Sequence, residues 1–280
     1  MSDPLVSTGW LAERLGSNEI AIVDATWFMP GDGKLGRDAY AASHIPGAVF
    51  FDIDNIADHA TDLPHMLPAP DAFAQAAGAL GLRRDLITVV YDGQGIFSAP
   101  RVWWTLRIMG FPEVFVLDGG LPKWRAEGRP LETALPHPAP TTLEPAFDPS
   151  LVRDLEGMRA TLAAHDAQVI DARAGPRFRG EVPEPRAGLR SGHMPGALNL
   201  AWNGLLNPDG TMKAASHLRA AFQASGTDLD GPIVTTCGSG VSASVLALAL
   251  ARLGREDVAV YDGSWTEWAG RADTPIVTGP

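Results

Sequence analysis

The stretch "VAVYDGSWTEW" (residues 258–268) has a counterpart, "VFVLDGGLPKW" (114–124), in the first half of the chain. Two further pairs keep a similar spacing: "AIVDA" (21–25) is matched by "QVIDA" (168–172), and "SHIPGAVFF" (43–51) by "GHMPGALNL" (192–200). The paired stretches start 144, 147 and 149 residues apart. Such a regular offset indicates that the chain contains two copies of one structural unit.

The segment between the two copies is rich in proline. "RPLETALPHPAPTTLEPAFDPS" (129–150) contains six prolines, each of which fixes φ and lacks a backbone N–H donor. This composition predicts an extended linker rather than a helix or a strand. We therefore expect an N-terminal domain over residues 1–130, a linker over 131–150 and a C-terminal domain over 151–280.

Each predicted domain alternates short, β-branched apolar runs with stretches of helical character. The runs are "EIAIVDA" (19–25), "LITVVYD" (86–92) and "EVFVLDG" (113–119) in the first domain, and "AQVIDA" (167–172), "PIVTT" (232–236) and "DVAVYDG" (257–263) in the second. Continuous apolar strands separated by helices are typical of a parallel sheet covered on both faces. The sequence therefore predicts an α/β protein with two domains, each a parallel β-sheet flanked by helices.

Composition excludes several classes of function. The 280 residues carry 33 acidic and 22 basic side chains, a net charge of −11, so a phosphate backbone would be repelled and a nucleic-acid partner is not expected. The N-terminus has no basic start followed by an apolar run, and no window approaches eighteen uninterrupted apolar residues, so we expect neither export nor membrane insertion. A cytoplasmic protein is the resulting expectation.

The sequence has a single cysteine, Cys237, in "TTCGSGVSAS" (235–244). One cysteine excludes an internal disulfide and a cysteine-rich zinc site, so Cys237 is either a buried apolar residue or a reactive thiol. Its position decides between them, because ligands gather beyond the carboxyl ends of parallel strands and the run 232–236 ends at this residue. The small residues that follow allow backbone N–H groups and the next helix N-terminus to point at the sulfur, which favours a nucleophilic thiolate.

The first copy provides an internal comparison. When "VVYDGQGIFSAP" (89–100) is aligned with the cysteine stretch, Asp92 holds the position of Cys237. We therefore expect the N-terminal domain to be non-catalytic and the C-terminal domain to be catalytic.

The tandem units, the linker and the loop around Cys237 together resemble the two-domain rhodanese family of sulfurtransferases, over nearly the whole chain. Within that family the loop is similar to that of the 3-mercaptopyruvate sulfurtransferases, whereas thiosulfate sulfurtransferases usually carry Arg and Lys after the cysteine. Ser242 stands where Thr is common, and both residues keep the hydroxyl group. The resemblance implies an active-site loop made by Cys237, Gly238, Ser239, Gly240, Val241 and Ser242.

Charge considerations agree with that resemblance. Thiosulfate is a dianion that gains from cations beside the thiolate, and Gly238 and Ser239 supply none. Mercaptopyruvate carries its carboxylate away from its sulfur and is suited to a guanidinium fork at some distance. The family motif places the substrate-binding arginines at Arg177 and Arg186, with Arg179 as the neighbour excluded less firmly, and exposed surface arginines are the structural alternative.

The resemblance also implies a proton-handling triad of Asp54, His65 and Ser239. In this arrangement the aspartate fixes the tautomer of the histidine, and the histidine polarises the serine hydroxyl beside the thiolate. His59 is an alternative in the same segment, and an exposed surface histidine is the structural alternative. His44 and His193 precede Pro-Gly at equivalent positions of both copies, which indicates a structural role in a turn.

We expect the thiolate to take the sulfur of 3-mercaptopyruvate, to release pyruvate and to remain as a Cys237 persulfide. No second cysteine can resolve the persulfide, so the sulfur must pass to an external acceptor such as a small thiol, thioredoxin or cyanide. No metal or organic cofactor is expected.

Three other functions compete with this interpretation. A thiosulfate-preferring sulfurtransferase is the nearest, and the missing loop cations count against it. A cysteine phosphatase needs an arginine six positions after the cysteine, where this chain has Ala243. A non-catalytic binding module with an inert Cys237 is the third, and it predicts slow alkylation of the thiol.

Overall fold

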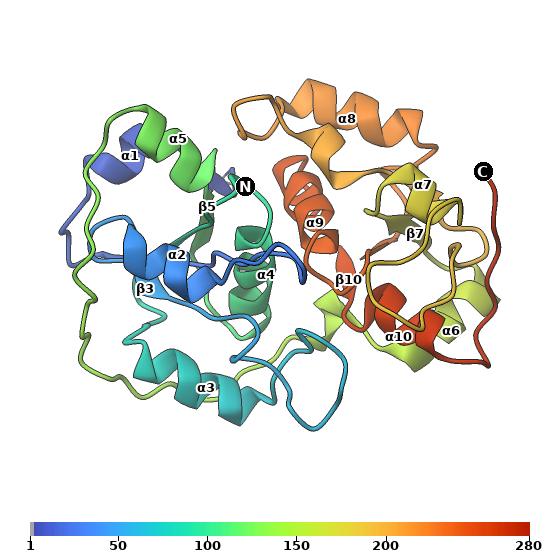
Figure 1. Cartoon of the computed structure of the whole chain (residues 1–280), viewed down its shortest axis with the longest axis horizontal. Helices are drawn as coiled ribbons and strands as arrows, with labels where there is room; N and C mark the ends of the chain where they lie inside the picture. The colour runs from blue at the N-terminus through green and yellow to red at the C-terminus, as the bar shows by residue number, and fades with distance from the viewer. Residues whose placement is uncertain (1–2) are drawn as a thin grey trace. The chain divides into compact units, whose positions relative to one another are not determined.

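Two five-stranded sheets of the same topology organise the chain. The structure is a computed structural model that describes residues 3–280. The strand order is β1-β5-β4-β2-β3 in the first sheet and β6-β10-β9-β7-β8 in the second, and every pairing is parallel (Figure 1). The expected α/β fold, with two units built on parallel sheets flanked by helices, is confirmed.

The strands are short and their central members are buried. The bounds in the first sheet are β1 Leu5–Val6, β2 Ile20–Asp24, β3 Val49–Phe50, β4 Ile87–Tyr91 and β5 Val114–Leu117. In the second sheet they are β6 Val152–Arg153, β7 Gln168–Asp171, β8 Leu198–Asn199, β9 Ile233–Thr236 and β10 Ala259–Tyr261.

Helices connect these strands as a parallel sheet requires. In the first half of the chain they are α1 Thr8–Ala12, α2 Gly36–Ala42, α3 Pro70–Ala79, α4 Ala99–Ile108 and α5 Gly120–Ala126. In the second half they are α6 Leu155–Ala164, α7 Gly175–Phe178, α8 Ala215–Ala224, α9 Ala243–Arg252 and α10 Ser264–Gly270, with short 3₁₀ turns at Pro149–Leu151 and Trp202–Leu205.

The register of the strands explains why the two copies carry the same motifs. Asp24 pairs with Tyr91 in the first sheet, and Asp171 pairs with Thr236 in the second. The residue that follows each central strand is therefore Asp92 or Cys237, at the same carboxyl edge. The topology thus places the cysteine at the strand end where ligands of open parallel sheets bind.

A tryptophan anchors the last helix of each unit in the core. Trp124 and Trp268 are 0% and 1% exposed, and each donates its indole N–H to a carbonyl beyond its helix, that of Pro130 at 2.8 Å or Pro275 at 2.9 Å. Burial of a tryptophan with its N–H satisfied is strongly stabilising. The two units therefore use the same device to fix the helix that follows their β5 or β10 strand.

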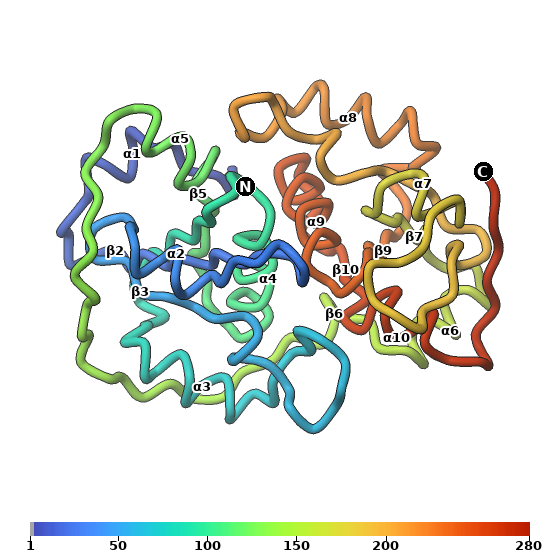
Figure 2. The backbone as a smooth tube through the Cα atoms, viewed as in Figure 1, coloured from blue at the N-terminus to red at the C-terminus, as the bar shows by residue number. Residues whose placement is uncertain are grey.

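The compact units do not divide the chain at a single point. The first comprises Met1–His59, Leu67–Asp148 and Leu206–Met212, and the second comprises Ala60–Met66, Pro149–Leu205 and Lys213–Pro280. Within the first unit, the extended chain after α5 passes α3, where the Thr141 N–H donates to the Gly78 carbonyl at 2.9 Å (Figure 2). The Ala60–Met66 segment of the second unit contains His65, a member of the predicted triad.

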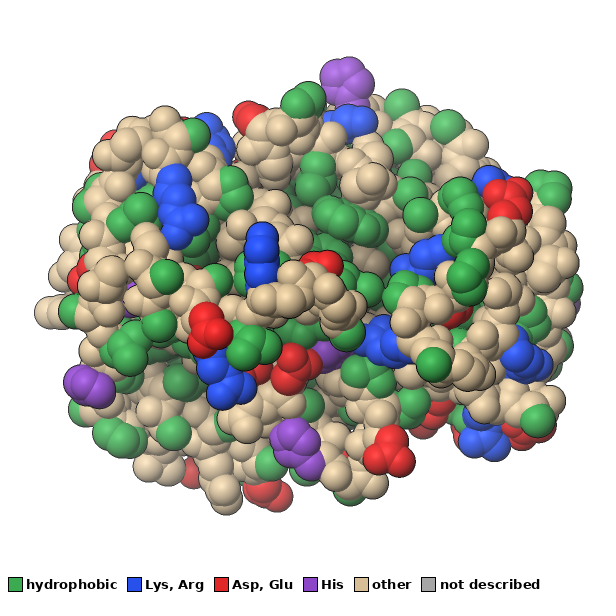
Figure 3. Space-filling model, viewed as in Figure 1, with side chains coloured by type: hydrophobic (Ala, Val, Ile, Leu, Met, Phe, Trp, Pro, Cys, Tyr) green, Lys and Arg blue, Asp and Glu red, His purple; other side chains and the backbone are tan. Residues whose placement is uncertain are grey.

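The surface carries charges of both signs. On the face drawn in Figure 3, Lys and Arg side chains are interspersed with Asp and Glu, without a broad basic area on this face of the described chain. Within residues 3–280, the helices are too short and too polar for any of them to cross a bilayer.

Candidate active site

Cys237 lies directly after β9 and before the loop that leads into α9. The strand is buried along its whole length, and the cysteine itself is 2% exposed. Gly240, in the middle of the loop, has a φ of 77°, which a residue with a side chain adopts only at a cost. The loop thus turns sharply at Gly240 on its way from Cys237 to α9.

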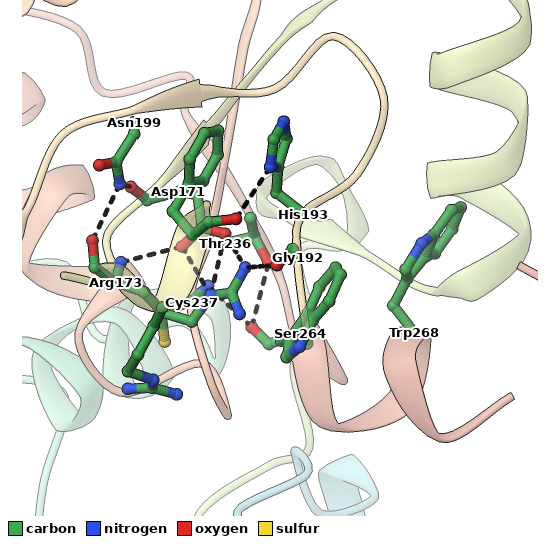
Figure 4. A network of polar contacts seen from close by, with 12 residues as sticks. Asp171, Arg173, Gly192, His193, Asn199, Thr236, Cys237, Ser264 and Trp268 are labelled. Carbon is green, nitrogen blue, oxygen red and sulfur yellow. Dashed lines mark hydrogen bonds and ion pairs between the residues drawn. The ribbon is translucent and has the colours of Figure 1, made fainter. Parts of the chain in front are cut away.

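The loop is held from outside by the first turn of α10. The Trp265 N–H donates to the Cys237 carbonyl at 2.9 Å. The Gly238 carbonyl accepts from the Thr266 N–H at 3.0 Å and from the Thr266 hydroxyl at 2.6 Å. The Cys237 N–H donates to the Ser264 hydroxyl oxygen at 3.3 Å (Figure 4).

The equivalent loop of the first unit shows what such a turn accommodates. Asp92 is fully buried, and its carboxylate accepts the N–H groups of Gln94, Phe97, Ser98 and Ala99 at 2.8 to 3.0 Å. Burial raises the pKa of Asp92, and these backbone hydrogen bonds oppose the rise by favouring the carboxylate. The strand-loop-helix turn therefore directs four backbone N–H donors at one acceptor, and in the first unit that acceptor is the carboxylate of Asp92.

Arg177 and Arg186, the two arginines predicted from the sequence, lie beside the loop that follows Cys237. A side chain at Gly238 would place its Cβ 3.3 Å from Arg177 Nη2 and 3.9 Å from Arg186 Nη1. Arg186 also donates from Nη2 to the Ser239 hydroxyl at 3.4 Å. Both guanidinium groups therefore lie beside the backbone next to the thiol, and a side chain at position 238 would crowd that of Arg177.

Arg177 is fixed by a carboxylate that the sequence analysis did not identify. Glu184, whose side chain is 2% exposed, pairs with Arg177 at 2.5 Å and with Arg173 at 2.9 Å. A buried carboxylate is stable when each oxygen is matched by a charged donor, as here. Glu184 therefore sets the position of Arg177, and it also pairs with the guanidinium of Arg173, which is more deeply buried.

Arg173 connects this pair to the core of the second unit. It pairs with Asp171 at 2.6 Å, donates to the Gly192 carbonyl at 2.9 Å and lies 4.2 Å over the Trp265 ring (Figure 4). Burial lowers the pKa of Arg173, but the two carboxylates outweigh it and raise this pKa above the ordinary arginine value. The guanidinium is thus a permanent cation beneath the site.

Arg179 does not join the other two arginines in these contacts. It pairs with Glu181 at 2.6 Å, and that hydrogen bond raises the pKa of Arg179. Both side chains are substantially exposed, at 36% and 53%. Its contacts therefore favour the exclusion of Arg179 from the substrate-binding set.

The predicted triad is distributed over both units. Ser239 is 6% exposed in the cysteine loop, and His65, also 6% exposed, lies in the Ala60–Met66 segment of the second unit with a φ of 62°. Asp54 lies in the first unit, where it accepts the Trp27 indole N–H at 2.9 Å. The alternative His59 is exposed and contacts the Asn55 carbonyl at 3.0 Å. The triad of Asp54, His65 and Ser239 stays a prediction.

His44 and His193 occupy equivalent structural positions, in agreement with their proposed role in a turn. The His44 Nδ1 lies 2.8 Å from the Tyr40 carbonyl and its ring stacks on Tyr40. The His193 Nδ1 lies 2.9 Å from the Phe178 carbonyl and its ring stacks on Phe178.

Three residues that contact the site were missed by the sequence analysis: Glu184, Ser264 and Thr266. Glu184 stands between the two predicted arginines, so an acid at that place was a usable signal. Ser264 and Thr266 replace Gly120 and Pro122 in the aligned motif, which was a second signal. Within residues 3–280, no group of three or more His, Cys, Asp or Glu side chains is arranged to hold a metal ion.

Comparison with known proteins agrees with this architecture. A 3-mercaptopyruvate sulfurtransferase of Escherichia coli K12 is 45% identical over 275 residues, which cover 97% of this chain and 96% of the relative. A mitochondrial thiosulfate/3-mercaptopyruvate sulfurtransferase of Arabidopsis thaliana is 43% identical, over an alignment that covers 98% of this chain and 78% of the Arabidopsis protein. The crystal structure of SseA from Escherichia coli, described as a 3-mercaptopyruvate sulfotransferase with the rhodanese fold, superimposes with a TM-score of 0.87 at 42% identity, covering 94% of this chain and 99% of that one.

The rhodanese-like domain family matches this chain twice, over residues 7–127 and 154–271. Each match covers four strands of one sheet and the helices of that unit, while the edge strands β1 and β6 lie just before the matched residues. The matches confirm the family that the sequence resemblance indicated. The chain therefore belongs to the rhodanese family and carries two rhodanese-like domains in tandem.

Proposed function

We propose that the protein is a sulfurtransferase that takes the sulfur of 3-mercaptopyruvate as a Cys237 persulfide and passes it to a thiol or cyanide acceptor. The observation that carries this proposal is the convergence of Arg177 and Arg186 on Gly238, next to the thiol. Gly238 and Ser239 themselves bring no cation to the sulfur. The site thus offers guanidinium groups for a carboxylate beside a nucleophile that lacks an adjacent charged side chain.

The first half-reaction forms the persulfide. The Cys237 thiolate attacks the sulfur of 3-mercaptopyruvate, an S–S bond forms, and the C–S bond breaks with its electron pair left on carbon as the enolate of pyruvate. Protonation of that carbon gives pyruvate. The loop that holds the Asp92 carboxylate in the first unit is the precedent for holding an anionic sulfur at Cys237 in the second.

The proton for the enolate is assigned to Ser239 and His65, with Asp54 orienting the histidine. Ser239 supports this role because it lies two residues after the thiol and accepts from Arg186 at 3.4 Å. His65 supports it because the Ala60–Met66 segment is part of the catalytic unit.

The second half-reaction returns the thiol. An acceptor thiolate, or cyanide, attacks the outer sulfur of the persulfide, and Cys237 leaves as a thiolate. The acceptor is external because Cys237 is the only cysteine of the chain. A small thiol or thioredoxin in the cytoplasm is the proposed acceptor.

Preference between donors tests the proposal. We expect kcat/KM for 3-mercaptopyruvate to exceed that for thiosulfate by tenfold or more, equivalent to about 1.4 kcal/mol of transition-state binding, with one common thiol acceptor. Cys237→Ser is the blank and should transfer no sulfur from either donor. A thiosulfate preference would overturn the assigned donor and leave the persulfide chemistry standing, whereas turnover that survives in Cys237→Ser would overturn both.

Thiosulfate transfer is the second candidate function. The Arabidopsis relative carries both donors in its name, and the same two arginines would bind a dianion. A non-catalytic binding module is the third, and alkylation separates it from the two enzymes. A thiol activated by the loop reacts fast with iodoacetamide near neutral pH, whereas an inert buried thiol reacts slowly.

A further inference from the structure

We infer that the first turn of α10 positions the catalytic loop, with Ser264 and Thr266 as positioning residues that aim backbone N–H groups at the sulfur of Cys237. This inference rests on the proposed role of Cys237 and extends it to a second element of the fold. Neither residue contacts the sulfur. Each acts through the loop backbone, and we call this set of contacts the α10 clamp.

The α10 clamp binds three backbone polar groups of two consecutive loop residues, the N–H and C=O of Cys237 and the C=O of Gly238. Ser264 accepts the Cys237 N–H at 3.3 Å, and its own hydroxyl donates to the Tyr261 carbonyl at 2.8 Å, so its orientation is fixed. Trp265 binds the Cys237 carbonyl, and Thr266 binds the Gly238 carbonyl with two donors, at 3.0 Å and 2.6 Å. Two peptide units of the loop are therefore held with their carbonyls facing α10.

Peptide geometry explains how the α10 clamp can orient N–H groups toward the thiol. In a trans peptide the C=O and the following N–H point in opposite directions. With the carbonyls of Cys237 and Gly238 drawn toward α10, the N–H groups of Gly238 and Ser239 face away from it, toward the inside of the loop. That inside position is where the first unit holds its anion, since the Gln94 N–H, the counterpart of that of Ser239, donates to Asp92 at 2.8 Å.

The non-catalytic unit lacks three of the clamp contacts, the one made by Ser264 and the two made by Thr266. Its Leu121 N–H still binds the Asp92 carbonyl at 3.0 Å, as Trp265 does for Cys237. At the position of Ser264, however, it has Gly120, which offers no hydroxyl oxygen. At the position of Thr266 it has Pro122, which offers neither a hydroxyl nor an N–H donor. In that unit the Asp92 carboxylate organises the loop itself, whereas a cysteine sulfur is a weak acceptor and cannot.

Backbone conformation provides independent support. Ser264 is fully buried with a φ of 49°, a left-handed conformation that is strained for serine, whereas Gly120 adopts 53° without a side chain. A serine at this place therefore weakens the fold relative to glycine and has to be explained by what its hydroxyl contacts. Residues held in such conformations concentrate at functional sites.

The test replaces the α10 clamp by its counterpart from the other unit. Ser264→Gly/Thr266→Pro recreates the first turn of α5, Thr266→Val removes only the hydroxyl donor, and Thr266→Ser keeps both donors. We expect kcat for 3-mercaptopyruvate to fall about tenfold in Thr266→Val and further in the double variant, with KM nearly unchanged. Thr266→Ser should stay close to the wild type.

Alkylation of Cys237 by iodoacetamide as a function of pH gives the second readout, which needs no sulfur donor. We expect the midpoint of this profile to rise by about one pH unit in the double variant, because fewer N–H groups then face the thiolate. The matched control is His165→Gly, which relieves another left-handed residue (φ 53°) at the end of α6. It should leave kcat and the alkylation profile as they are.

The outcomes separate the clamp from the proposed function. An alkylation profile that is unchanged in Thr266→Val and in the double variant, both folded by thermal unfolding, would overturn the clamp whatever the turnover. If the wild type transfers no sulfur from either donor while the profile still shifts, the proposed function fails and the clamp stands. The single variant Ser264→Gly tests the serine alone. If it loses stability while the pH profile of Cys237 alkylation is unchanged, Ser264 has only a structural role.

Discussion

The Glu184 carboxylate pairs with Arg177 at 2.5 Å while it is itself 2% exposed, so the guanidinium beside the Cys237 loop is paired with a buried anion. The same carboxylate binds Arg173, which is fixed to Asp171 and to the core. The position of Arg177 is therefore fixed by buried ion pairs of the second unit.

Replacing this carboxylate is expected to weaken substrate binding. Glu184→Gln keeps the shape of the side chain but removes the charge that orients Arg177, so KM for 3-mercaptopyruvate should rise about tenfold with a smaller change in kcat. Steady-state kinetics measure the split. Glu181→Gln, which releases only the exposed Arg179, is the control, and equal KM values for the two variants would contradict the role of Glu184.

The two substrate arginines are expected to be sensitive to a change that keeps their charge. Arg177→Lys and Arg186→Lys retain a cation but lose the planar fork that matches a carboxylate, so kcat/KM for 3-mercaptopyruvate should fall by about tenfold or more in each. Arg179→Lys should have little effect. The account fails at this point if the change at Arg179 is as harmful as that at Arg177 or Arg186.

Asp92 is expected to stabilise the unit that has no thiol. Asp92→Ala leaves four N–H donors, three of them buried, without their acceptor, which should lower the free energy of unfolding by about 2 kcal/mol. Urea unfolding of the full chain measures this loss, and Asp85→Ala, at an exposed aspartate, is the control. A difference between the two variants smaller than the error of the measurement would show that the carboxylate does not organise this loop.

Asp24 and Asp171 occupy equivalent positions of the two units. We expect their replacement by asparagine to change the free energy of unfolding in opposite directions. Burial raises the pKa of Asp24 and the charge of Asp92 adds to this effect, although hydrogen bonds from Thr26 and Tyr91 oppose it. The charged form of Asp24 therefore destabilises the fold at neutral pH. Asp24→Asn should be more stable there, and its advantage should shrink as the pH falls through the raised folded-state pKa and vanish below the unfolded value of about 3.9.

Asp171→Asn should instead lose about 3 kcal/mol or more, because it leaves the buried Arg173 short of a partner. Thermal or urea unfolding between pH 3 and 8 compares the two variants at matched conditions. If both variants are destabilised at neutral pH, the contrast between a buried lone carboxylate and a buried ion pair is wrong.

The repeat made the fold predictable from the sequence. The paired motifs placed Asp92 and Cys237 at the same strand end, and parallel topology then located the site. The positions of Arg177 and Arg186 beside Gly238 agree with the family motif, and their role in binding substrate stays a prediction.

The supporting contacts were harder to predict because they join segments far apart in the chain. Ser264 and Thr266 lie 27 and 28 residues from the loop positions that they bind, and apolar periodicity carries no signal for such contacts. Glu184 could be suspected from its neighbours, but its burial beneath Arg177 depends on Arg173 and Trp265, which the sequence presents as unrelated residues.

Persulfide formation at Cys237 is tested most directly by the intact mass of the protein after one equivalent of 3-mercaptopyruvate is added without an acceptor. We expect a gain of one sulfur atom, located at Cys237 by peptide mapping, removed by a thiol and absent in Cys237→Ser. Release of pyruvate should match that gain in amount. Pyruvate released without a sulfur on Cys237, or a sulfur that is carried elsewhere, would contradict the account.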